Sequence, residues 1–410
     1  MNSLLWRGEF ARLWWGGLIN AIGTWMTGAA LPVYVYTTTE SVPAAGAMAL
    51  AATLPGVLLG SSAGVIADRF DRRAVLVVTN LLAALSLLPL LFVGTQGLWV
   101  VYLSAVLKAL VTLPTGPARS ALLPALVPEA QLAQANALNA LNNNLARLVG
   151  PALGGLIFAA ADLSSVVVLD LVTYLVAAAF IASLAPHPLP AGPREAVRAA
   201  LTAGWRAVRV SPALLTLVLY LAVTSIGEGV FGVLLAPFVT HVLGGDARAF
   251  GWVLSAQAIG GVVGGALVAR HAGRVAPLRL WVFGAAGLGL ADLAIFLYPL
   301  AWPGVGPALV LMVLAGVPAS AAGAGWMTLA QHFTDDAVRG RVFGLAGQLS
   351  GVGLLLGLGL ATLAGQAAPI TALLCVHSAL LMLGGLGAWV VWRSRQLDRL
   401  PAGAAPATAA

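Results

Sequence analysis

Twelve long apolar runs, separated by short polar segments, divide almost the whole chain. An α-helix needs about 20 residues to cross ~30 Å of hydrocarbon, and every run is of about that length or longer. The runs fall at 12–36, 44–67, 74–94, 98–118, 135–161, 163–185, 212–240, 249–269, 278–299, 307–329, 340–366 and 369–392. The pattern predicts an all-α integral membrane protein with twelve transmembrane helices.

Composition supports a membrane protein. Of the 410 residues 60% are hydrophobic and only 9% are charged, and there are 48 glycines, which transmembrane helices tolerate better than soluble ones. The N-terminal segment carries Arg7 and Glu9 and runs into the first apolar stretch without a small-residue cleavage site. We therefore expect this stretch to be a retained span, not a removed signal peptide.

The basic residues set the expected orientation. With the N-terminus inside, all Lys and Arg residues lie in predicted cytoplasmic segments except Arg248, which lies outside, and Lys108 and Arg147, which lie within spans. This asymmetry follows the positive-inside rule and predicts a multi-pass cell-membrane protein with both termini in the cytoplasm. It also accounts for the net charge of +7, so no nucleic-acid partner is expected.

Several kinds of chemistry are not expected. The single cysteine, Cys375, excludes an internal disulfide and a multi-cysteine metal site. There is no Gly-Lys dipeptide, so the phosphate-binding loop of an ATP-driven pump is absent. Gly60 to Gly64 fits the hydrolase pattern Gly-x-Ser-x-Gly, but it closes a predicted span instead of forming a strand-to-helix turn. We expect no enzyme activity, no cofactor and no bound metal.

The longest polar interruption divides the spans into two sets of six. Residues 186–211 begin with "PHPLPAGP" and continue with Val197, Leu201, Trp205 and Val208 at helical spacing, which predicts a cytoplasmic linker with an amphipathic helix on the membrane surface. The expected parts are an N-terminal bundle at 1–185, this linker, a C-terminal bundle at 212–396 and a disordered tail at 397–410.

The second half echoes the first. "GVIADRFDRR", residues 64–73, returns as "GALVARHAGR" at 265–274, with Asp68 replaced by Ala269. Both segments join the second and third spans of a half. This predicts two parallel six-span repeats, an arrangement that in many transporters places substrate near the midplane between the halves.

At these residues the chain resembles the major facilitator superfamily. The superfamily's loop motif between spans 2 and 3 is matched by Gly64, Asp68, Arg69, Arg72 and Arg73, with Asp71 where Gly is usual. "GPALGG" in span 5 is similar to the antiporter motif, through Gly150, Pro151, Gly154 and Gly155, although Ala146 stands at an earlier glycine of that motif. The segment "DRFDRR" resembles the loop motif of the drug:proton antiporters that include siderophore exporters and macrolide efflux pumps.

The motif residues also allow a physical interpretation. Asp68 is expected to pair with Arg72 or Arg73, or to face the positive end of a helix, and so to latch the cytoplasmic side in one transport state. The alternative is that the arginines only anchor topology. In span 5, Pro151 and its neighbouring glycines predict a kinked, closely packed helix, and a role in exchange direction is implied only by the resemblance.

Five ionisable residues lie within predicted spans. A charge at the centre of a span costs about 2.5–3.5 kcal/mol, so such residues indicate a functional site by default. The candidates for proton coupling are Glu228, Lys108, Arg147, Asp292 and Asp170. The resemblance places spans 1, 4, 7 and 10 around the central path, which favours Lys108 and Glu228 over Asp170 and Asp292.

Lys108 is the only lysine, and a buried lysine can lose its proton whereas arginine effectively cannot. Its alternatives are a snorkelling side chain or a structural ion pair, and Glu228 has the alternative of a static partner for Lys108 or Arg147. The polar stripe of Asn136, Asn139, Asn143 and Arg147 favours interhelical hydrogen bonds over a cavity wall. His377, alone in span 12, is interpreted as structural.

Polar, aromatic and Met side chains on spans of the expected path form the predicted substrate cavity. They are Asn20, Thr24, Trp25, Met26, Thr27, Thr112, Thr224, Trp326 and Met327. Such residues suit adaptable contact with amphiphilic substrates, although they suit lipid-facing packing equally well. Span 1 has no acidic residue, unlike several drug exporters of the superfamily, which argues against broad specificity for cationic drugs.

The preferred function is a proton-coupled exporter of small amphiphilic molecules of the drug, macrolide or siderophore type, working by alternating access as a monomer in the lipid bilayer. A proton-coupled importer, or a lipid or lysolipid flippase on the same fold, is the alternative. A non-transporting sensor or membrane enzyme is the least favoured reading.

Overall fold

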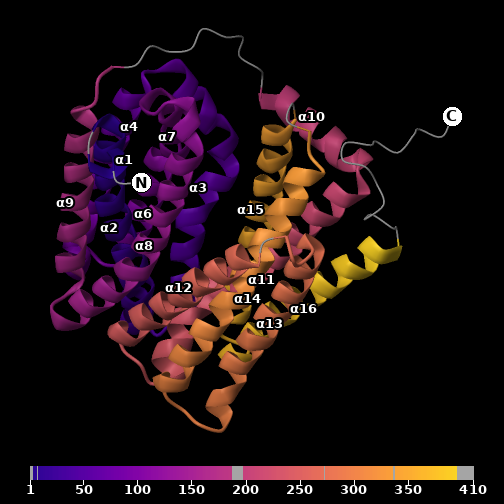
Figure 1. Ribbon diagram of the computed structural model, residues 1–410. Coiled ribbons are helices and arrows are strands. Elements are labelled where there is room, and N and C mark those ends of the chain that lie inside the picture. The colour runs from indigo at the N-terminus through magenta and orange to yellow at the C-terminus, as the bar shows by residue number, and fades with distance from the viewer. Residues whose placement is uncertain (1–2, 7, 187–196, 272, 336–337, 395–410) are drawn as a thin grey trace. The chain divides into compact units, whose positions relative to one another are not determined.

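The chain is described by a computed structural model that covers residues 1–410 except 1–2, 7, 187–196, 272, 336–337 and 395–410 (Figure 1). The described residues are helical and include no strand. The predicted tail at 397–410 and the start of the predicted linker lie outside them. The chain divides into two compact units, Met1–Pro193 with Gly245–Ser255 (unit 1) and Arg194–Gly244 with Ala256–Ala410 (unit 2).

The first half of the chain contains nine α-helices among its described residues. They are α1 (Ser3–Trp6), α2 (Gly8–Thr39), α3 (Val42–Arg69), α4 (Arg72–Leu87), α5 (Val93–Gln96), α6 (Trp99–Thr112), α7 (Thr115–Leu126), α8 (Leu132–Ala160) and α9 (Leu163–Ala182), with short 3₁₀ turns at Leu88–Phe92 and Glu129–Gln131.

The second half begins with the linker helix α10 (Val197–Val210). Six long helices follow: α11 (Pro212–Pro237), α12 (Ala247–Arg270), α13 (Pro277–Leu297), α14 (Val305–His332), α15 (Arg339–Ala364) and α16 (Ile370–Ser394). A π-helical turn at Phe238–Val242 extends α11, and a 3₁₀ turn at Tyr298–Leu300 extends α13.

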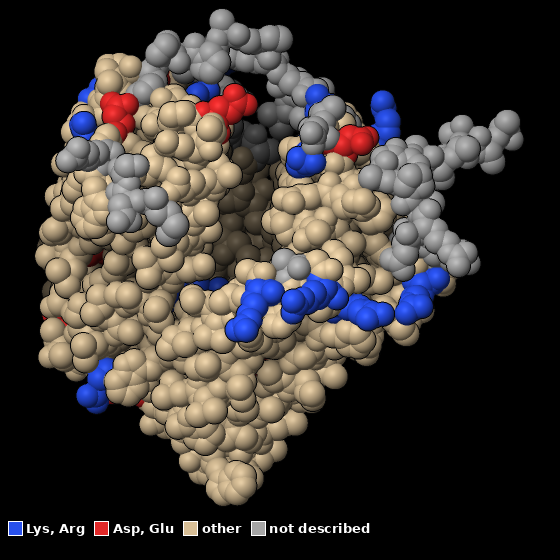
Figure 2. All heavy atoms as spheres, viewed as in Figure 1, with Lys and Arg blue, Asp and Glu red and all other residues tan. Residues whose placement is uncertain are grey.

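The twelve predicted spans are confirmed as helical segments, and eleven of those described are long and apolar enough to cross a membrane. The remaining long helix, α8, is less apolar because its first half carries six Asn or Gln side chains and Arg147. Figure 2 shows broad areas of one face that carry no charged residue, as lipid contact requires.

Prolines break two of the predicted spans. Pro89 ends α4 in a 3₁₀ turn, and Pro114 separates α6 from α7 inside the run predicted at 98–118. Proline lacks the backbone N–H that an α-helix uses, so the apolar run continues while the helix does not.

The two units repeat the same pairing of helices. In unit 1, α2 packs on α8 and α9, and α4 packs on α9; in unit 2, α11 packs on α15 and α16, and α13 packs on α16 (Figure 1). Closely packed glycines recur at equivalent places. A Cβ on Gly150 or Gly154 of α8 would collide with the α2 backbone, and a Cβ on Gly353 or Gly357 of α15 would collide with the α11 backbone.

The linker helix α10 packs on α15 and α11. Val208 is fully buried, and a Cβ on Gly204 would lie 2.6 Å from the carbonyl oxygen of Arg341. Trp205, which the sequence places on the same apolar face as Val208, is 47% exposed. The small Gly204 lets the backbones of α10 and α15 approach.

Candidate functional site

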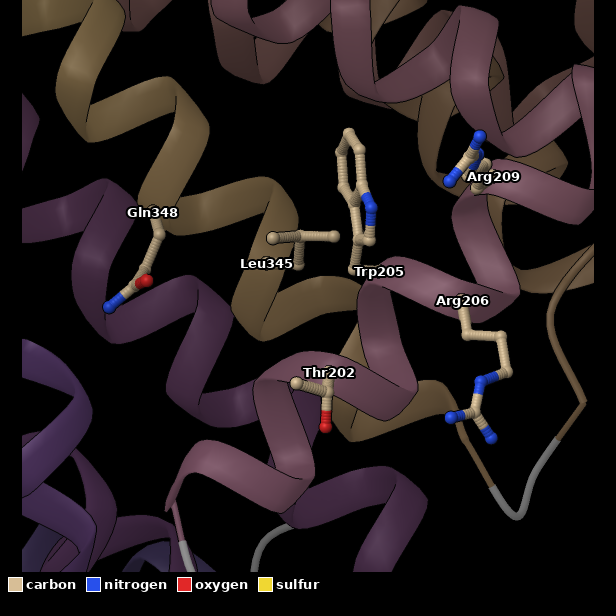
Figure 3. Close-up of a pocket in the computed structure, with 6 residues that line it drawn as sticks. All are labelled: Thr202, Trp205, Arg206, Arg209, Leu345 and Gln348. Carbon is tan, nitrogen blue, oxygen red and sulfur yellow. The ribbon is translucent and has the colours of Figure 1, made fainter.

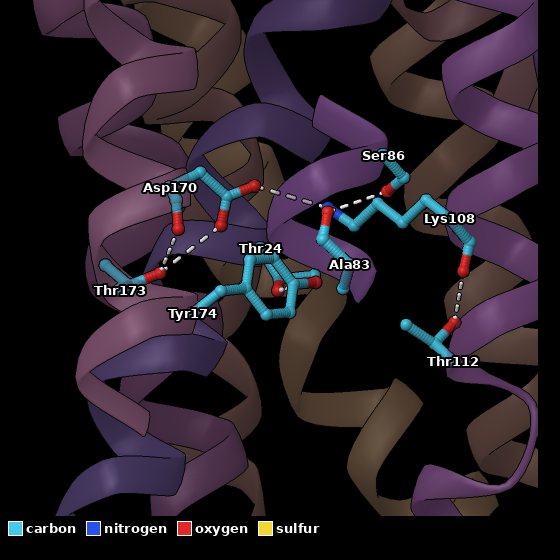
Figure 4. A network of polar contacts seen from close by, with 8 residues as sticks. All are labelled: Thr24, Ala83, Ser86, Lys108, Thr112, Asp170, Thr173 and Tyr174. Carbon is cyan, nitrogen blue, oxygen red and sulfur yellow. Dashed lines mark hydrogen bonds and ion pairs between the residues drawn. The ribbon is translucent and has the colours of Figure 1, made fainter. Parts of the chain in front are cut away.

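The clearest polar site of unit 1 is an ion pair between α6 and α9 (Figure 4). The Nζ atom of Lys108 lies 3.2 Å from Oδ2 of Asp170. The Asp170 side chain is fully buried, and that of Lys108 is 21% exposed. The structure therefore joins two of the five predicted intramembrane charges and gives Lys108 the ion-pair partner that the sequence left open.

Neighbouring polar side chains fix this pair. Thr173 donates a hydrogen bond to the carbonyl oxygen of Asp170 at 2.7 Å and lies 3.3 Å from its carboxylate Oδ1. The Lys108 ammonium lies 5.2 Å from the centre of the Tyr174 ring, and the Tyr174 hydroxyl is hydrogen-bonded to Thr24 of α2 at 3.1 Å. A buried ion pair needs such supporting bonds, because its own attraction barely offsets the cost of desolvation.

Gly23 lets α2 approach this pair. A Cβ at Gly23 would collide with Thr173 Oγ1 and would lie 2.7 Å from Asp170 Oδ1. Any larger residue would therefore push α2 away from the carboxylate.

Unit 2 holds a second buried acid–base pair, between α13 and α16. His377 of α16 places Nε2 at 3.2 Å from Oδ2 of Asp292 on α13, and both side chains are only 3% exposed. Here Gly227 of α11 makes the close approach, since a Cβ on it would lie 2.8 Å from His377 Nδ1.

Aromatic rings surround the imidazole. Phe231 stacks on it with ring centres 5.2 Å apart and an interplanar angle of 29°, and Phe296 meets it at 6.4 Å. Glu228, next to Gly227 on α11, is exposed. Two ionisable side chains, from α13 and α16, thus meet inside unit 2, and α11, which carries Glu228, packs on α16.

The polar stripe of α8 behaves differently from its predicted role. Asn136 and Asn143 are exposed, and Arg147 lies 6.0 Å above the ring of Trp25 on α2. The interhelical hydrogen bond comes from Asn142, which donates to the carbonyl oxygen of Trp14 at 2.8 Å. The expectation of interhelical bonds was wrong for Asn136 and Asn143 because the packed face of α8 is one position away.

The arginines of the loop motif bind helix ends within unit 1. Arg72 donates to the carbonyl oxygen of Ala121 at 2.7 Å, and Arg73 donates to the carbonyl oxygens of Ile181 and Ala182 at the end of α9. Arg12 of α2 binds the next carbonyl, that of Ser183. Cations there satisfy free carbonyls and the negative end of the helix dipole.

Asp71, the departure from the family motif, has a defined role. Its side chain caps α4 by accepting a hydrogen bond from the Ala74 N–H at 3.0 Å, with an ordinary φ of −54°. Arg69 is exposed. The side chain of Asp68 lies outside the described part of the chain, so the latch predicted for it stays a prediction.

The predicted cavity residues separate into two groups. Asn20, Thr24, Trp25, Thr112 and Trp326 are partly exposed and Met327 is exposed, whereas Met26, Thr27 and Thr224 are at most 5% exposed. Met26 belongs to the apolar core of unit 1. The substrate contacts proposed below therefore leave out the three buried residues.

A pocket of about 500 Å³ lies beside the linker helix in unit 2 (Figure 3). Trp205 and Leu345 stand next to each other in it, and the exposed Arg206 and Arg209 extend from α10. Thr202 and Gln348 complete its lining. The pocket combines an aromatic ring with cationic side chains.

A comparison with known families decides what kind of protein carries these sites. The model of a family described as transmembrane secretion effectors matches residues 3–402. The chain belongs to this family. It is accordingly a multi-pass membrane transporter of the major facilitator type, as the loop and span-5 motifs indicate.

Curated relatives of this secretion-effector family member are efflux proteins. The multidrug efflux pump Tap of Mycolicibacterium fortuitum is 31% identical over 96% of this chain and 98% of its own. The enterobactin exporter EntS of Escherichia coli is 25% identical over 93% and 92%. Macrolide efflux protein A of Streptococcus pyogenes is 26% identical, over 43% of this chain and 44% of its own.

Solved structures share the fold of this secretion effector. A bacterial homologue of the iron transporter ferroportin, in an inward-facing state, aligns with a TM-score of 0.74 at 17% identity over 94% of this chain and 97% of its own. A bacterial homologue of the lysosomal transporter Spinster aligns with a TM-score of 0.73 at 16% identity over 96% and 98%. At such identities the likeness shows the fold alone.

Sequence reasoning missed His377, Gly23 and Gly227 as site residues of this secretion effector. A signal for the glycines was present: "IGTWMTG" at 22–28 returns as "IGEGVFG" at 226–232, which aligns Gly23 with Gly227 and Thr24 with Glu228. His377 is the only histidine within a predicted span, but its partner Asp292 is 85 residues away in sequence.

Proposed function

We propose that this protein is a proton-coupled exporter of small amphiphilic molecules, working by alternating access as a monomer in the cell membrane. The buried Lys108–Asp170 pair is the observation that carries the proposal. Charges in a membrane interior are costly and are kept where ions or substrates pass. A lysine and a carboxylate can each change protonation state, unlike an arginine.

The pair suggests how protons and substrate exchange. A proton taken up by Asp170 from outside converts the carboxylate to a neutral acid and releases Lys108 from its partner. Loss of that proton to the cytoplasm restores the ion pair for the next cycle. Glu228, exposed on α11, is a second carboxylate that can load a proton in the same way, while Arg147 holds its charge throughout.

The substrate class rests on the relatives and on the side chains of the predicted path. The relatives are named as pumps for multiple drugs, macrolides and enterobactin. Trp25, Trp326 and Met327 offer apolar contact surface, and Asn20, Thr24 and Thr112 offer hydrogen bonds. Since α2 carries no acid beyond Glu9 at its start, macrolide-like or siderophore-like substrates are favoured over small organic cations.

The test is transport in proteoliposomes with an imposed pH gradient and radiolabelled erythromycin, a macrolide, as the probe. The wild type should move the probe against its gradient only when protons flow the opposite way. Asp170→Asn should abolish this uphill movement, because it leaves Lys108 without a counter-ion. Asp162→Asn is the matched control, since Asp162 caps the start of the same helix outside the apolar run.

The proposal fails if the wild type transports neither erythromycin nor a catecholate siderophore in response to a pH gradient. It also fails if Asp170→Asn, inserted and folded as the wild type, transports as well as Asp162→Asn does.

A lipid or lysolipid flippase is the second candidate, favoured by an apolar groove between α11 and α16. The groove has a volume of about 430 Å³ and is lined by Pro212, Leu215, Thr216, Leu219, Tyr220, Val223, Leu380, Leu383, Gly384, Gly387, Ala388 and Val391. A fluorescent lysophosphatidylcholine replaces erythromycin in the same proteoliposomes. Its transfer between leaflets, with no erythromycin flux, would favour the flippase.

A further inference from the structure

Arg119 is a cation inside unit 1 for which the described residues provide no counter-ion. The sequence places it in a cytoplasmic segment, but it lies within the apolar helical segment Trp99–Leu126, about two turns before the end of α7. Its partly buried guanidinium group reaches α2, where a Cβ on Gly17 would collide with Nη2 and would lie 2.8 Å from Nη1. Gly17 therefore leaves room for a charged group beside the α2 backbone.

Other cations of the unit 1 helices have acceptors, which sets Arg119 apart. Lys108 binds a carboxylate, and Arg12 and Arg73 bind carbonyl oxygens at the end of α9. Within the part of the chain that the structure describes, Arg119 donates no hydrogen bond and forms no ion pair. No acid lies on α7, and α2 has only Glu9, in its first turn. Charges inside a membrane are costly and are kept where ions or substrates pass, so we expect the partner of Arg119 to be a ligand.

Two more polar groups lie near this contact and find no hydrogen-bond partner among the described residues. They are Nδ2 of Asn20 on α2 and Oγ1 of Thr115 on α7, and both atoms are buried. Asn20 follows Gly17 by three residues, and Thr115 precedes Arg119 by four, so each shares the helix face of the contact. Spans 1 and 4 cross the membrane in opposite directions, so both groups lie one turn from the contact on the same side. A buried donor without an acceptor is unfavourable until a ligand supplies one.

The first turn of α7 adds positive potential at the same place. Pro114 precedes α7, whose first residue is Thr115, so this helix begins inside the apolar segment Trp99–Leu126. A helix that begins within the membrane presents the positive end of its dipole there. In transporters such half-helix starts face the anionic groups of substrates. The start of α7 thus strengthens the attraction of the Arg119 guanidinium for an anion.

We propose that Arg119, Asn20 and Thr115 bind the acidic group of the transported molecule, a carboxylate or an ionised phenol. The guanidinium bonds such a group through two parallel N–H donors, and the amide and the hydroxyl donate to its remaining lone pairs. Binding gives all three side chains the partner that they lack. This inference rests on the proposed export and narrows its substrates to acidic amphiphiles, so that siderophore-like molecules are preferred to macrolides.

The experiment uses two probes that differ in charge, pyrenebutyrate and its neutral amide pyrenebutyramide. Their binding to the whole protein in a neutral detergent is followed by quenching of tryptophan fluorescence. The wild type should bind the carboxylate about tenfold more tightly than the amide, or more, which corresponds to one charge-assisted hydrogen bond. Arg119→Gln should bind the two probes equally, and Arg119→Lys should restore part of the preference.

Arg279→Gln is the matched control, because Arg279 is exposed in the first turn of α13 and its loss removes the same charge. This variant should keep the full preference. Asn20→Ala and Thr115→Val should each lower the preference several-fold. Arg119→Gln should keep or raise the Tm, because it removes a cation for which the folded chain supplies no acceptor among its described residues.

Four results would overturn the inference. The first is equal affinity of the wild type for the two probes, and the second is a preference that persists in Arg119→Gln. The third is a lowered Tm or lost erythromycin transport in Arg119→Gln, which would assign the arginine to the fold or to the transport motion. The fourth is loss of the preference when phosphatidylglycerol is added to the micelles, since a lipid head group would then fill the site.

The proposed function fails by a different result. A wild type that transports neither erythromycin nor a catecholate siderophore in response to a pH gradient contradicts proton-coupled export. The preference for pyrenebutyrate is measured without a membrane or a gradient, so it stands or falls independently of that outcome.

Discussion

Gly23 sets the distance between α2 and the carboxylate of Asp170. Replacement by Ala adds a methyl group where Thr173 and Asp170 already lie, so one of the helices or the ion pair has to move. We expect Gly23→Ala to destabilise the purified protein by about 1–3 kcal/mol, the usual cost of overpacking. A lowered Tm in detergent measures it.

Gly28 is the control on the same helix. A Cβ there meets nothing within 4 Å, and Ala favours a helix over Gly by about 0.8–1.0 kcal/mol. Gly28→Ala should therefore leave the Tm unchanged or raise it. Equal losses of Tm in the two variants would show that the contact with α9 does not matter.

Single residues were predictable where their chemistry conflicts with their surroundings. Lys108, Asp170 and Asp292 were found because a charge inside an apolar run is costly whatever it contacts. Their partners were not predictable, because Lys108 and Asp170 are 62 residues apart and only the packing of α6 and α9 brings them together. His377 was missed because a neutral imidazole carries no such cost, so its significance depends on Asp292 being next to it.

At the scale of a helix, the C-terminal end of α9 depends on arginines from two other helices. Arg73 of α4 binds the carbonyls of Ile181 and Ala182, and Arg12 of α2 binds that of Ser183 just beyond the helix. We expect Arg73→Ala to destabilise the protein by about 1–2 kcal/mol, the value of a charge-assisted hydrogen bond at a helix end. Unfolding in detergent, followed by tryptophan fluorescence, measures the change.

Arg69 belongs to the same motif but is exposed, so Arg69→Ala should stay within about 0.5 kcal/mol of the wild type. If both variants behave alike, the arginines of this loop serve topology and not the packing of α9.

Helices were easier to predict than their ends and faces. Long apolar runs identified all twelve spans, since hydrocarbon thickness fixes their minimum length. Breaks at Pro89 and Pro114 were not predicted, because membrane helices tolerate proline when neighbours satisfy the freed carbonyls. The packed face of α8 was assigned one residue away from its true place, since only the packing of the helices shows that Asn142 and not Asn143 meets α2.

For the whole molecule, charge distribution predicts which loops face the cytoplasm. Arg248 is the one basic residue expected outside the cell. Its Nε atom lies 2.8 Å from Oδ2 of Asp246, so its charge is neutralised by a partner and opposes the predicted orientation less. The bond from the Ala249 N–H and the adjacent Arg248 hold the pKa of Asp246 below its usual value despite partial burial, so this neutralisation persists at mildly acidic pH.

Cysteine labelling tests that orientation. In a Cys375→Ser background, Arg248→Cys should react with a membrane-impermeant maleimide in intact cells, and Arg274→Cys should react only after permeabilisation. The opposite labelling pattern would show that the protein has the inverted orientation in the membrane, and the proposed direction of transport would then be reversed too.

The two-fold repeat was predicted from ten residues of loop sequence, and the paired glycines of α8 and α15 agree with it. The chemistry at the repeated contact was not predictable from the repeat, because only the glycine is common to both halves, as Gly23 in α2 and Gly227 in α11. Side chains on the facing helix have diverged to Asp170 in one half and His377 in the other.

The solitary lysine has a practical consequence. Because every other basic side chain is arginine, a reagent that acylates amines finds one side-chain target in the chain, and that target is held against Asp170 with a fifth of its surface exposed. The rate at which Lys108 is modified thus reports directly whether its ion pair is closed or open. If the pair opens during transport as proposed, the chain contains a single-site reporter of that opening, readable by mass spectrometry without an attached dye.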